Sequence, residues 1–292
     1  MPDLYRVVAN FGAAVAVLDE ARQVHQAVPL TKLPQLVAGD QVECEQESGA
    51  SSLRVVKLIE RDGVLSRIDH RHKPKPLAAN VSHLAIISAA PPGIDSLLID
   101  QFCIAAELAG IDAMVVINKS DLLDEAALEQ CLAMLEVYRA IGYPAVLVDT
   151  KTEGKMEPLI TELDGKTVVL VGASGVGKSS IVQQLLPDLD VRVGAISAAT
   201  GFGSHTTSVT FWYELGSGGS IIDSPGVRQF SVSHLSAQDV RRGYLELVDA
   251  AQMCKFSNCS HVVEPDCAVK AGLADGSIAQ WRYDNYRKLA EL

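Results

Sequence analysis

The sequence lacks any apolar run long enough to cross a membrane, since no stretch of about 18 apolar residues occurs in its 292 residues. The first residues, Met1 to Arg6, also lack the charged-then-apolar pattern of a signal peptide, so we expect a cytoplasmic protein with no membrane contact. A basic excess is missing too, because the formal net charge is -11. This charge is weak evidence against an RNA partner, because a local basic patch could still bind phosphates.

Internal repeats and low-complexity tracts are absent as well, and the length suits two or three domains. Residues 1–70 contain short apolar runs separated by Gly, Ser and Asp turn residues, which is typical of a small β-barrel. An OB-type barrel is the first interpretation and an SH3-like barrel the second. Within residues 67–76, six basic side chains precede Pro76, which indicates either a solvated connector or a contact with RNA phosphates.

From residue 83 onward apolar strands alternate with helical stretches, so residues 71–234 are expected to form an α/β unit with a largely parallel sheet. The expected strands cover residues 83–88, 113–118, 145–149, 167–171, 209–214 and 220–223. The expected helices cover residues 96–108, 125–141, 155–163 and 177–186. Residues 235–292 are expected to form a mainly helical third unit that begins with a helix over residues 237–251.

The strongest motif follows the apolar residues Val168–Val171 and fits G-x-x-x-x-G-K-[ST]. Its glycines let backbone N–H groups wrap the phosphates of a nucleotide, and the next helix adds its partial positive charge. We predict that Lys178 reaches the β- and γ-phosphates and that the Ser179 hydroxyl ligates Mg²⁺. The residues predicted to surround the phosphates are Gly172, Ala173, Ser174, Gly175, Val176, Gly177, Lys178, Ser179 and Ser180.

A second motif, Asn118-Lys119-Ser120-Asp121, fits N-K-x-D at the end of another apolar strand. An aspartate there can accept two hydrogen bonds from the ring N–H and the amine of guanine. Adenine offers neither donor in that arrangement, so the carboxylate would be left unpaired. The motif therefore predicts GTP rather than ATP and disfavours a metabolic kinase that uses ATP.

A third motif, Asp223-Ser224-Pro225-Gly226, fits D-x-x-G after the strand over residues 220–223. We predict that Asp223 binds in the Mg²⁺ shell and that the Gly226 amide senses the γ-phosphate. Many GTPases place next a glutamine that orients the attacking water. Val227 stands at that position here and cannot do so.

A Gly- and Ser-rich segment, residues 201–208, lies between the P-loop and D-x-x-G and has the composition of a switch loop. Thr207 is predicted to complete the Mg²⁺ shell, with Thr206 as the alternative. His205 is the candidate to position water in place of the missing glutamine, and an ordinary polar loop histidine is the other interpretation.

The order of these motifs is unusual, because N-K-x-D precedes the P-loop, whereas in a common GTPase it follows. A sheet tolerates new termini when the old ones lie close together, so the unit is interpreted as circularly permuted. The segment after D-x-x-G then leads directly into the C-terminal unit, and a shift that depends on the γ-phosphate could move that unit.

The C-terminal unit contains Cys254, Cys259, His261 and Cys267 within fourteen residues. Three thiolates and one imidazole form a closed tetrahedral set, which favours one structural zinc ion over a catalytic one. Buried free cysteines are the alternative. The segment has few apolar residues to make a core, which favours zinc.

Together and in this order, the motifs resemble one family, the ribosome small-subunit-dependent GTPases RsgA, also called YjeQ. The resemblance covers nearly the whole chain: the barrel, the segment from Lys73 to Val81, N-K-S-D, the P-loop, G-x-H-T-T, D-S-P-G-V-R and C-x₄-C-x-H-x₅-C. It implies an OB-fold, a permuted GTPase domain that takes Mg²⁺ with GTP or GDP, and a zinc domain. It also implies a bacterial cytoplasmic monomer that docks on the small (30S) ribosomal subunit and its 16S rRNA late in maturation.

In this family GTP hydrolysis is slow alone and is stimulated by the subunit. Val227 and His205 match family traits. Asp149 and Thr150 stand where a Ser-Ala pair usually contacts the guanine carbonyl, and a backbone amide there could still do so. An RNA-binding scaffold that is regulated by nucleotide, with little catalysis of its own, is the alternative function, because Val227 cannot orient water.

Overall fold

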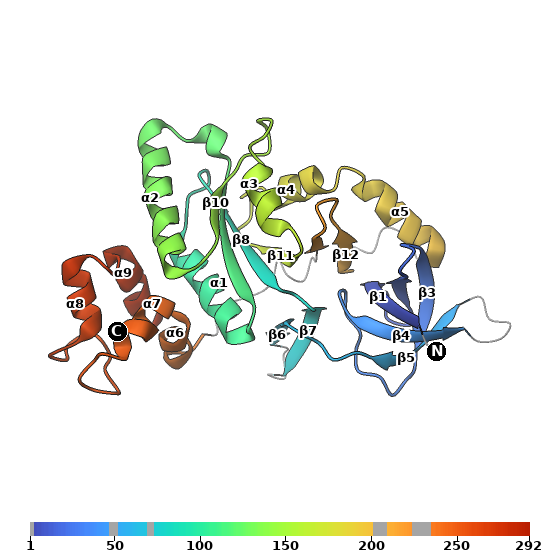
Figure 1. Ribbon diagram of the computed structural model, residues 1–292, viewed down its shortest axis with the longest axis horizontal. Coiled ribbons are helices and arrows are strands. Elements are labelled where there is room, and N and C mark those ends of the chain that lie inside the picture. The colour runs from blue at the N-terminus through green and yellow to red at the C-terminus, as the bar shows by residue number, and fades with distance from the viewer. Residues whose placement is uncertain (1–2, 47–51, 69–72, 201–208, 224–234) are drawn as a thin grey trace.

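The computed structural model describes residues 3–46, 52–68, 73–200, 209–223 and 235–292, which form three units in sequence order (Figure 1). A barrel lies at one end, a group of C-terminal helices at the other, and an α/β unit between them. In these described ranges, no helix has both the length and the apolar character that a membrane span needs. The predicted site residues His205, Thr207 and Gly226 lie outside the described residues.

The N-terminal unit contains the strands β1 (Asp3–Asn10), β2 (Val15–Leu18), β3 (Val24–Pro29), β4 (Gln41–Gln46) and β5 (Leu53–Leu58). They close in the order β1-β2-β3-β5-β4-β1, with β3 and β5 parallel and the other neighbours antiparallel. Val7, Val15, Val17, Val42 and Val55 fill the barrel and have no exposed surface. This closed order is that of an OB-type barrel, and it confirms the first interpretation.

A short hairpin of β6 (Val64–Ile68) and β7 (Pro74–Ala79) follows the barrel. The described ends of the basic segment over residues 67–76 are strands, because Arg67 pairs with Lys75 within this hairpin, while Arg67 and Lys73 are exposed as the interpretation of a solvated segment expects. The hairpin is held in place by apolar residues next to the basic ones, because Leu65 and Ala78 are buried in the core of the α/β unit.

The α/β unit contains the strands β8 (His83–Ala89), β9 (Asp112–Asn118), β10 (Ala145–Leu147), β11 (Thr167–Val171), β12 (Phe211–Glu214) and β13 (Ser220–Asp223). Their order is β10-β9-β8-β11-β13-β12, and all neighbours are parallel except β12 and β13. The predicted α/β unit with a largely parallel sheet is confirmed. The carboxyl ends of these parallel strands lie at one edge, where ligands bind in such folds.

Helices cover both faces of this sheet. They are α1 (Ser96–Ala109), α2 (Glu125–Ile141), α3 (Glu157–Leu163), α4 (Lys178–Leu185) and α5 (Leu189–Thr200), with a 3₁₀ turn η1 (Ser120–Leu122). The helices α1 and α2 pack in one core cluster, and α3, α4 and α5 in the other. The helix α5 was not among the predicted helices, because its run of small residues around Gly194 gives no helical pattern of apolar positions.

The barrel and the α/β unit share one sheet. The strand β12 pairs antiparallel with β1 through Phe211 and Ala9, so the described strands of the two units form a continuous 11-stranded sheet.

The C-terminal unit contains α6 (Ala237–Gly243), α7 (Leu245–Ala251), α8 (Ala268–Asp275) and α9 (Gln280–Leu289). One helix was predicted over residues 237–251, but Tyr244 has extended backbone angles and divides that stretch into α6 and α7. Its fully buried side chain packs with α9 and α1, so tertiary packing outweighs the local helical pattern.

Candidate nucleotide-binding site and metal centre

The P-loop runs from the end of β11 to the start of α4, and two of its glycines leave no room for a side chain. Gly172 has φ +134°, and a Cβ atom there would lie 2.0 Å from the carbonyl oxygen of Ile87 in β8. Gly177 has φ +95°, and a Cβ atom there would lie 2.2 Å from Nδ2 of Asn118. Both positions therefore require glycine, which lets the loop pass tightly over the neighbouring strands.

Lys178 folds back over this loop. Its Nζ lies 2.8 Å from the carbonyl oxygen of Gly172 and 2.6 Å from that of Ala173, and it donates to both. Lys178, Ser179 and Asp223 line one pocket of about 240 Å³. The structure thus brings together the three side chains that the sequence analysis assigned to the phosphates and Mg²⁺. The other predicted polar or small positions, Ser174, Gly175 and Ser180, are exposed.

The guanine motif is tied directly to the P-loop. Asn118 ends β9 and is 1% exposed, and its Nδ2 donates to the carbonyl oxygen of Val176 at 2.9 Å. Lys119 has φ +63°, and its Nζ donates to the carbonyl oxygens of Gly175 at 2.6 Å and Pro91 at 2.9 Å. These bonds join two motifs more than fifty residues apart. They bring the N-K-x-D segment and the P-loop together at one edge of the sheet.

Asp121 lies in η1 at the same edge of the sheet. Its Oδ2 lies 3.0 Å from Nζ of Lys151, with the carboxylate 19% exposed and the lysine largely exposed. Lys151 is a residue that the sequence analysis did not assign to the site.

Asp149 is buried, and its carboxylate is used within its own loop. It accepts hydrogen bonds from the backbone N–H groups of Lys151 at 3.0 Å and Thr152 at 2.6 Å, and from the Ser120 hydroxyl at 3.3 Å. Burial alone would raise the pKa of Asp149, but these donors hold it below its ordinary value. The Thr150 carbonyl accepts from Gln184 of α4 at 3.0 Å, so this loop contacts the helix that begins at the P-loop.

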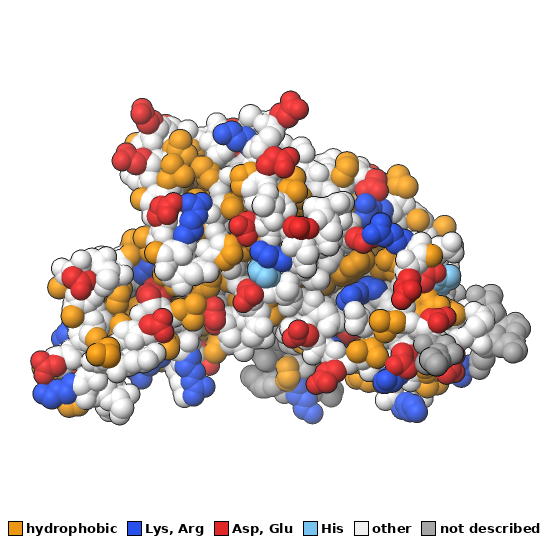
Figure 2. Space-filling model, in the orientation of Figure 1, with side chains coloured by type: hydrophobic (Ala, Val, Ile, Leu, Met, Phe, Trp, Pro, Cys, Tyr) orange, Lys and Arg blue, Asp and Glu red, His pale blue; other side chains and the backbone are white. Residues whose placement is uncertain are grey.

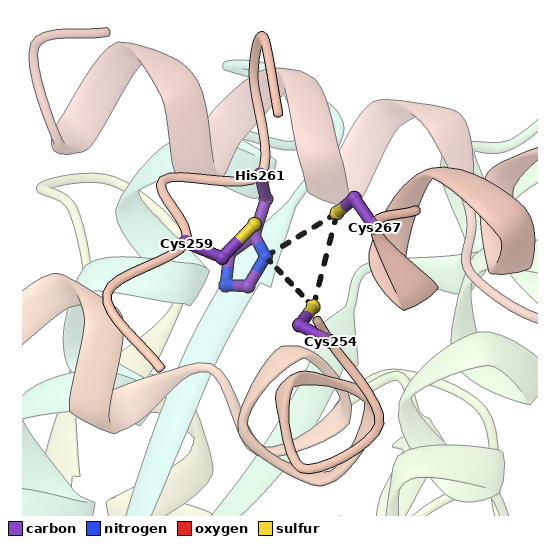
Figure 3. Close-up of side chains that lie close together, drawn as sticks. All are labelled: Cys254, Cys259, His261 and Cys267. Atoms are coloured by element: carbon purple, nitrogen blue, oxygen red, sulfur yellow. Dashed lines mark hydrogen bonds between the residues drawn. The ribbon is translucent and has the colours of Figure 1, made fainter. Parts of the chain in front are cut away.

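The predicted metal ligands converge in the C-terminal unit (Figure 3). The ligand atoms of Cys254, Cys259, His261 and Cys267 all lie within 4.8 Å of one another. The Nδ1 atom of His261 lies 3.7 Å from Sγ of Cys254 and 3.5 Å from Sγ of Cys267, and these two sulfurs are 3.9 Å apart. A tetrahedral zinc site would have edges of about 3.8 Å between sulfurs and about 3.6 Å from sulfur to nitrogen. The donor set and its spacing therefore fit zinc.

The loop between the ligands is fixed by contacts of its own. His261 has φ +65°, and its carbonyl oxygen accepts from the Tyr283 hydroxyl of α9 at 2.8 Å. The Glu264 carboxylate accepts hydrogen bonds from the backbone N–H groups of Ser260, at 2.8 Å, and of Val262 and Val263. These donors lower the pKa of Glu264 to about 2. Burial lowers the pKa of His261, so its imidazole is held in the neutral form that binds metals.

A buried ionic network fastens the C-terminal unit to the α/β unit. Asp100 of α1 has no exposed surface and accepts from Tyr138 at 2.7 Å, Tyr244 at 3.0 Å and Asn285 at 2.8 Å, as well as from Arg282. The Nε and Nη2 atoms of Arg282 donate to the two carboxylate oxygens of Glu246 in α7, at 2.7 and 2.9 Å.

Arg282 is charged at the centre of this network. It is 1% exposed, and its guanidinium carbon lies 4.4 Å from the ring centre of Tyr244 and 5.5 Å from that of Tyr138. Burial alone would lower the pKa of Arg282, but Asp100 and Glu246 hold it well above its ordinary value. No pattern in the sequence predicted this network. The one local signal was Asp100, one of two acids in the mainly apolar predicted helix over residues 96–108.

Comparison with known proteins adds a family to this geometry. A family model described as RsgA GTPase matches residues 58–233. The curated small ribosomal subunit biogenesis GTPase RsgA of Pseudomonas aeruginosa strain LESB58 is 42% identical over 284 residues, which cover 97% of this chain and 84% of that protein. The protein of the same name from Ectopseudomonas mendocina strain ymp is 42% identical over 287 residues, which cover 97% and 83%.

Two solved structures are similar along the whole chain. YjeQ from Thermotoga maritima has a TM-score of 0.80 at 28% identity and covers 100% of this chain and 98% of its own. YloQ, described as a circularly permuted GTPase, has a TM-score of 0.79 at 24% identity and covers 100% and 94%. The second similarity supports the fold, and in this chain too the N-K-x-D strand β9 precedes the P-loop strand β11.

Proposed function

Because the chain belongs to the RsgA GTPase family, we propose that its GTP hydrolysis is stimulated by the small ribosomal subunit late in the assembly of that subunit. The observation that carries the proposal is the 2.9 Å hydrogen bond from Asn118 to the Val176 carbonyl, which joins the guanine motif to the P-loop. Because the two motifs form one site, a ligand that fills it must carry both a base and phosphates, as a nucleotide does. The curated relatives are named small ribosomal subunit biogenesis GTPases, which supplies the partner.

The site residues have distinct roles in this proposal. Asp121 accepts hydrogen bonds from the guanine ring N–H and amine, and Lys151 pairs with its carboxylate at 3.0 Å. Lys178 exchanges its bonds to the loop carbonyls for the β- and γ-phosphate oxygens. The γ-phosphate charge that develops during transfer is then met by this lysine and by the N–H groups of the P-loop.

Magnesium fits the pocket that holds Lys178, because Ser179 and Asp223 line it together. Both residues offer oxygen, the ligand that Mg²⁺ prefers, and Thr207 completes the proposed set. Mg²⁺ bound there would supply positive charge to the β- and γ-phosphates. The hydroxyl comes from α4 and the carboxylate from the end of β13.

His205 is the residue that we propose to position the attacking water. Replacing His205 with Ala should lower turnover in the presence of small subunits by about 100-fold, because general-base positioning contributes on that scale. His25→Ala is the matched control, since His25 pairs with Asp19 in the barrel at 2.7 Å. Unchanged turnover in His205→Ala would show that His205 has no catalytic role and would favour the alternative of a nucleotide-regulated RNA scaffold.

We propose one structural zinc ion at Cys254, Cys259, His261 and Cys267. With four protein ligands the set is closed, so zinc would stabilise the fold of the C-terminal unit and leave no position for substrate.

We propose that a local basic surface contacts 16S rRNA, because the net charge of the whole chain is -11. On the face shown in Figure 2, acidic side chains are spread over all three units with Lys and Arg between them. A local basic surface exists near the metal centre, where Arg241 and Arg242 line a pocket with Phe256 and Asn258. Such a surface offers cations for phosphates and a ring for a base. We propose that the chain acts on the small subunit as a cytoplasmic monomer.

The proposal is tested by GTP turnover with and without purified small subunits, with ATP as the competing substrate. Stimulation of GTP turnover only would support it. Intact subunits that leave the rate unchanged would contradict it.

A further inference from the structure

Two of the four proposed zinc ligands lie in a loop that needs support. Cys254 follows the end of α7 and Cys267 directly precedes α8, so helices place these two sulfurs (Figure 3). Cys259 and His261 lie between those helices, in a loop that Glu264 braces from within. His261 has φ +65°, a backbone conformation that a residue with a side chain keeps only when its surroundings hold it. Contacts from outside the loop therefore help to set the geometry of the metal centre.

The helix α9 supplies such contacts through two tyrosines. The Oη atom of Tyr283 donates to the carbonyl oxygen of His261 at 2.8 Å. The Oη atom of Tyr286 donates to the carbonyl oxygen of Ser260 at 3.3 Å, and the Tyr286 ring centre lies 6.2 Å from that of His261. Both tyrosines are buried, so water competes little for these bonds. The helix thus fixes the loop backbone at His261 and at the residue before it.

Another face of α9 docks on the α/β unit. Residues three apart lie on one face of a helix, so Arg282 and Asn285 share a face next to the one that carries the two tyrosines. The Nδ2 atom of Asn285 donates to Asp100 at 2.8 Å and to the Ser96 hydroxyl at 3.1 Å, both in α1. Arg282 also donates to Asp100. One short helix is therefore held to α1 on one face and to the zinc loop on the next.

A second line of contacts runs through Tyr244, between α6 and α7. Its hydroxyl donates to Asp100 at 3.0 Å, and its ring packs edge to face with that of Tyr286, with centres 5.6 Å apart. Two of the three ligand cysteines belong to the same hydrophobic cluster as Ile104 of α1. Because protein interiors are close-packed, a displacement of α9 from α1 would displace the zinc loop as well.

We propose that docking on α1 sets the zinc affinity of the C-terminal unit, with Tyr283 and Tyr286 as the positioning residues that connect the two. This inference rests on the proposed zinc ion and is independent of the proposed hydrolysis. Without docking, α9 no longer fixes the loop, a smaller fraction of chains has all four ligands in place, and the apparent zinc affinity falls with that fraction. Coupled equilibria are reciprocal, so loss of zinc weakens the docking of the C-terminal unit by the same factor.

The test measures the zinc affinity of the full chain by competition with a chromogenic chelator. Two variants change the α/β unit alone: Asp100→Asn in α1, and Tyr138→Phe in α2, which removes one donor to Asp100 at 2.7 Å. Asp40→Asn is the matched control, because Asp40 also has no exposed surface and pairs with Arg61 at 2.7 Å, but in the N-terminal unit. Binding of a fluorescent GDP analogue reports, for each variant, that the α/β unit is folded.

We expect Asp100→Asn to raise the zinc dissociation constant by about tenfold or more, the usual scale of coupling between two sites. Tyr138→Phe should raise it by about threefold, the scale of one hydrogen bond, and Asp40→Asn should leave it within about twofold of wild type. In a background of Tyr283→Phe with Tyr286→Phe, Asp100→Asn should have a much smaller effect, because the connection is already broken.

Three results would overturn the inference: wild-type zinc affinity in both α/β variants, an equal loss in Asp40→Asn, or an undiminished effect of Asp100→Asn in the background without the two hydroxyls. If Asp100→Asn does not bind the GDP analogue, the milder Tyr138→Phe decides. Wild type that binds no zinc would instead overturn the proposed zinc ion and this inference with it, whatever the rate of GTP turnover.

Discussion

Removing the guanidinium of Arg282 should loosen the C-terminal unit from the α/β unit. In Arg282→Met the buried carboxylate of Asp100 loses its cation, and Glu246, with a side chain only 12% exposed, loses the same partner. Breaking one side of a buried ion pair costs about 3–5 kcal/mol, because a charge is left in a poorly solvated place. The guanidinium that lies over the Tyr244 ring is removed together with the charge, whereas methionine retains an apolar side chain of similar length, so most of the loss comes from the charged group.

Urea unfolding followed by Trp281 fluorescence measures this loss, because Trp281 packs on Tyr138 across the interface at 5.6 Å. A Trp212→Phe background removes the second of the two tryptophans. Lys57→Met, which breaks an exposed pair, should cost less than about 1 kcal/mol in the same assay. Adding Asp100→Asn to Arg282→Met should cost less than the sum of the single changes by about 1.5 kcal/mol or more. A loss below about 1 kcal/mol for Arg282→Met, or strict additivity, would refute the reasoning.

Three further outcomes follow from the two sites. Asp121→Asn should weaken GTP binding by about 10- to 100-fold in a fluorescent-nucleotide titration and improve binding of the xanthine nucleotide, whose C2 oxygen accepts from an amide; unchanged guanine preference would contradict it. Gly177→Ala should abolish nucleotide binding by pushing Nδ2 of Asn118 aside, whereas Gly175→Ala, with a similar positive φ and open space, should weaken it far less; equal losses would count against the contact. Elemental analysis should find one zinc per chain, and a chelator or Cys259→Ser should remove the C-terminal helical signal in circular dichroism but spare GTP binding; a metal-free, helical C-terminal unit would disprove the zinc assignment.

Sequence reasoning succeeded where chemistry is local. The P-loop needs glycines at fixed positions, so Gly172 and Gly177 could be identified from spacing, and the structure supplies the reason in the atoms their side chains would meet. The metal ligands lie within fourteen residues, so their convergence could be predicted before any fold was known. The parallel sheet and the closed barrel followed from the alternation and length of apolar runs.

The errors and omissions concern contacts between distant segments. Asp100 and Arg282 are 182 residues apart, and no local pattern pairs them. The helix α5 has no apolar period, since it is held by the barrel on one side and by Ile196 in the core on the other. The break at Tyr244 arises from packing against Asp100. Each feature depends on tertiary burial, which outweighs local propensity.

The permuted order ties the segment after D-x-x-G to the C-terminal unit, and a γ-phosphate-dependent shift that moves this unit stays a prediction. The described contacts fasten the unit to α1 by a buried ionic network. The residues that would carry the shift, 224–234, lie outside the described ranges.

The most direct test of a subunit-stimulated GTPase is one turnover experiment with three arms: the chain alone, with purified small subunits, and with purified large subunits. We predict slow GTP hydrolysis alone, at least about a tenfold increase with small subunits, and no increase with large subunits, because activators of P-loop GTPases act by completing the site. Equal rates in all three arms, with subunits shown to be intact, would contradict the account.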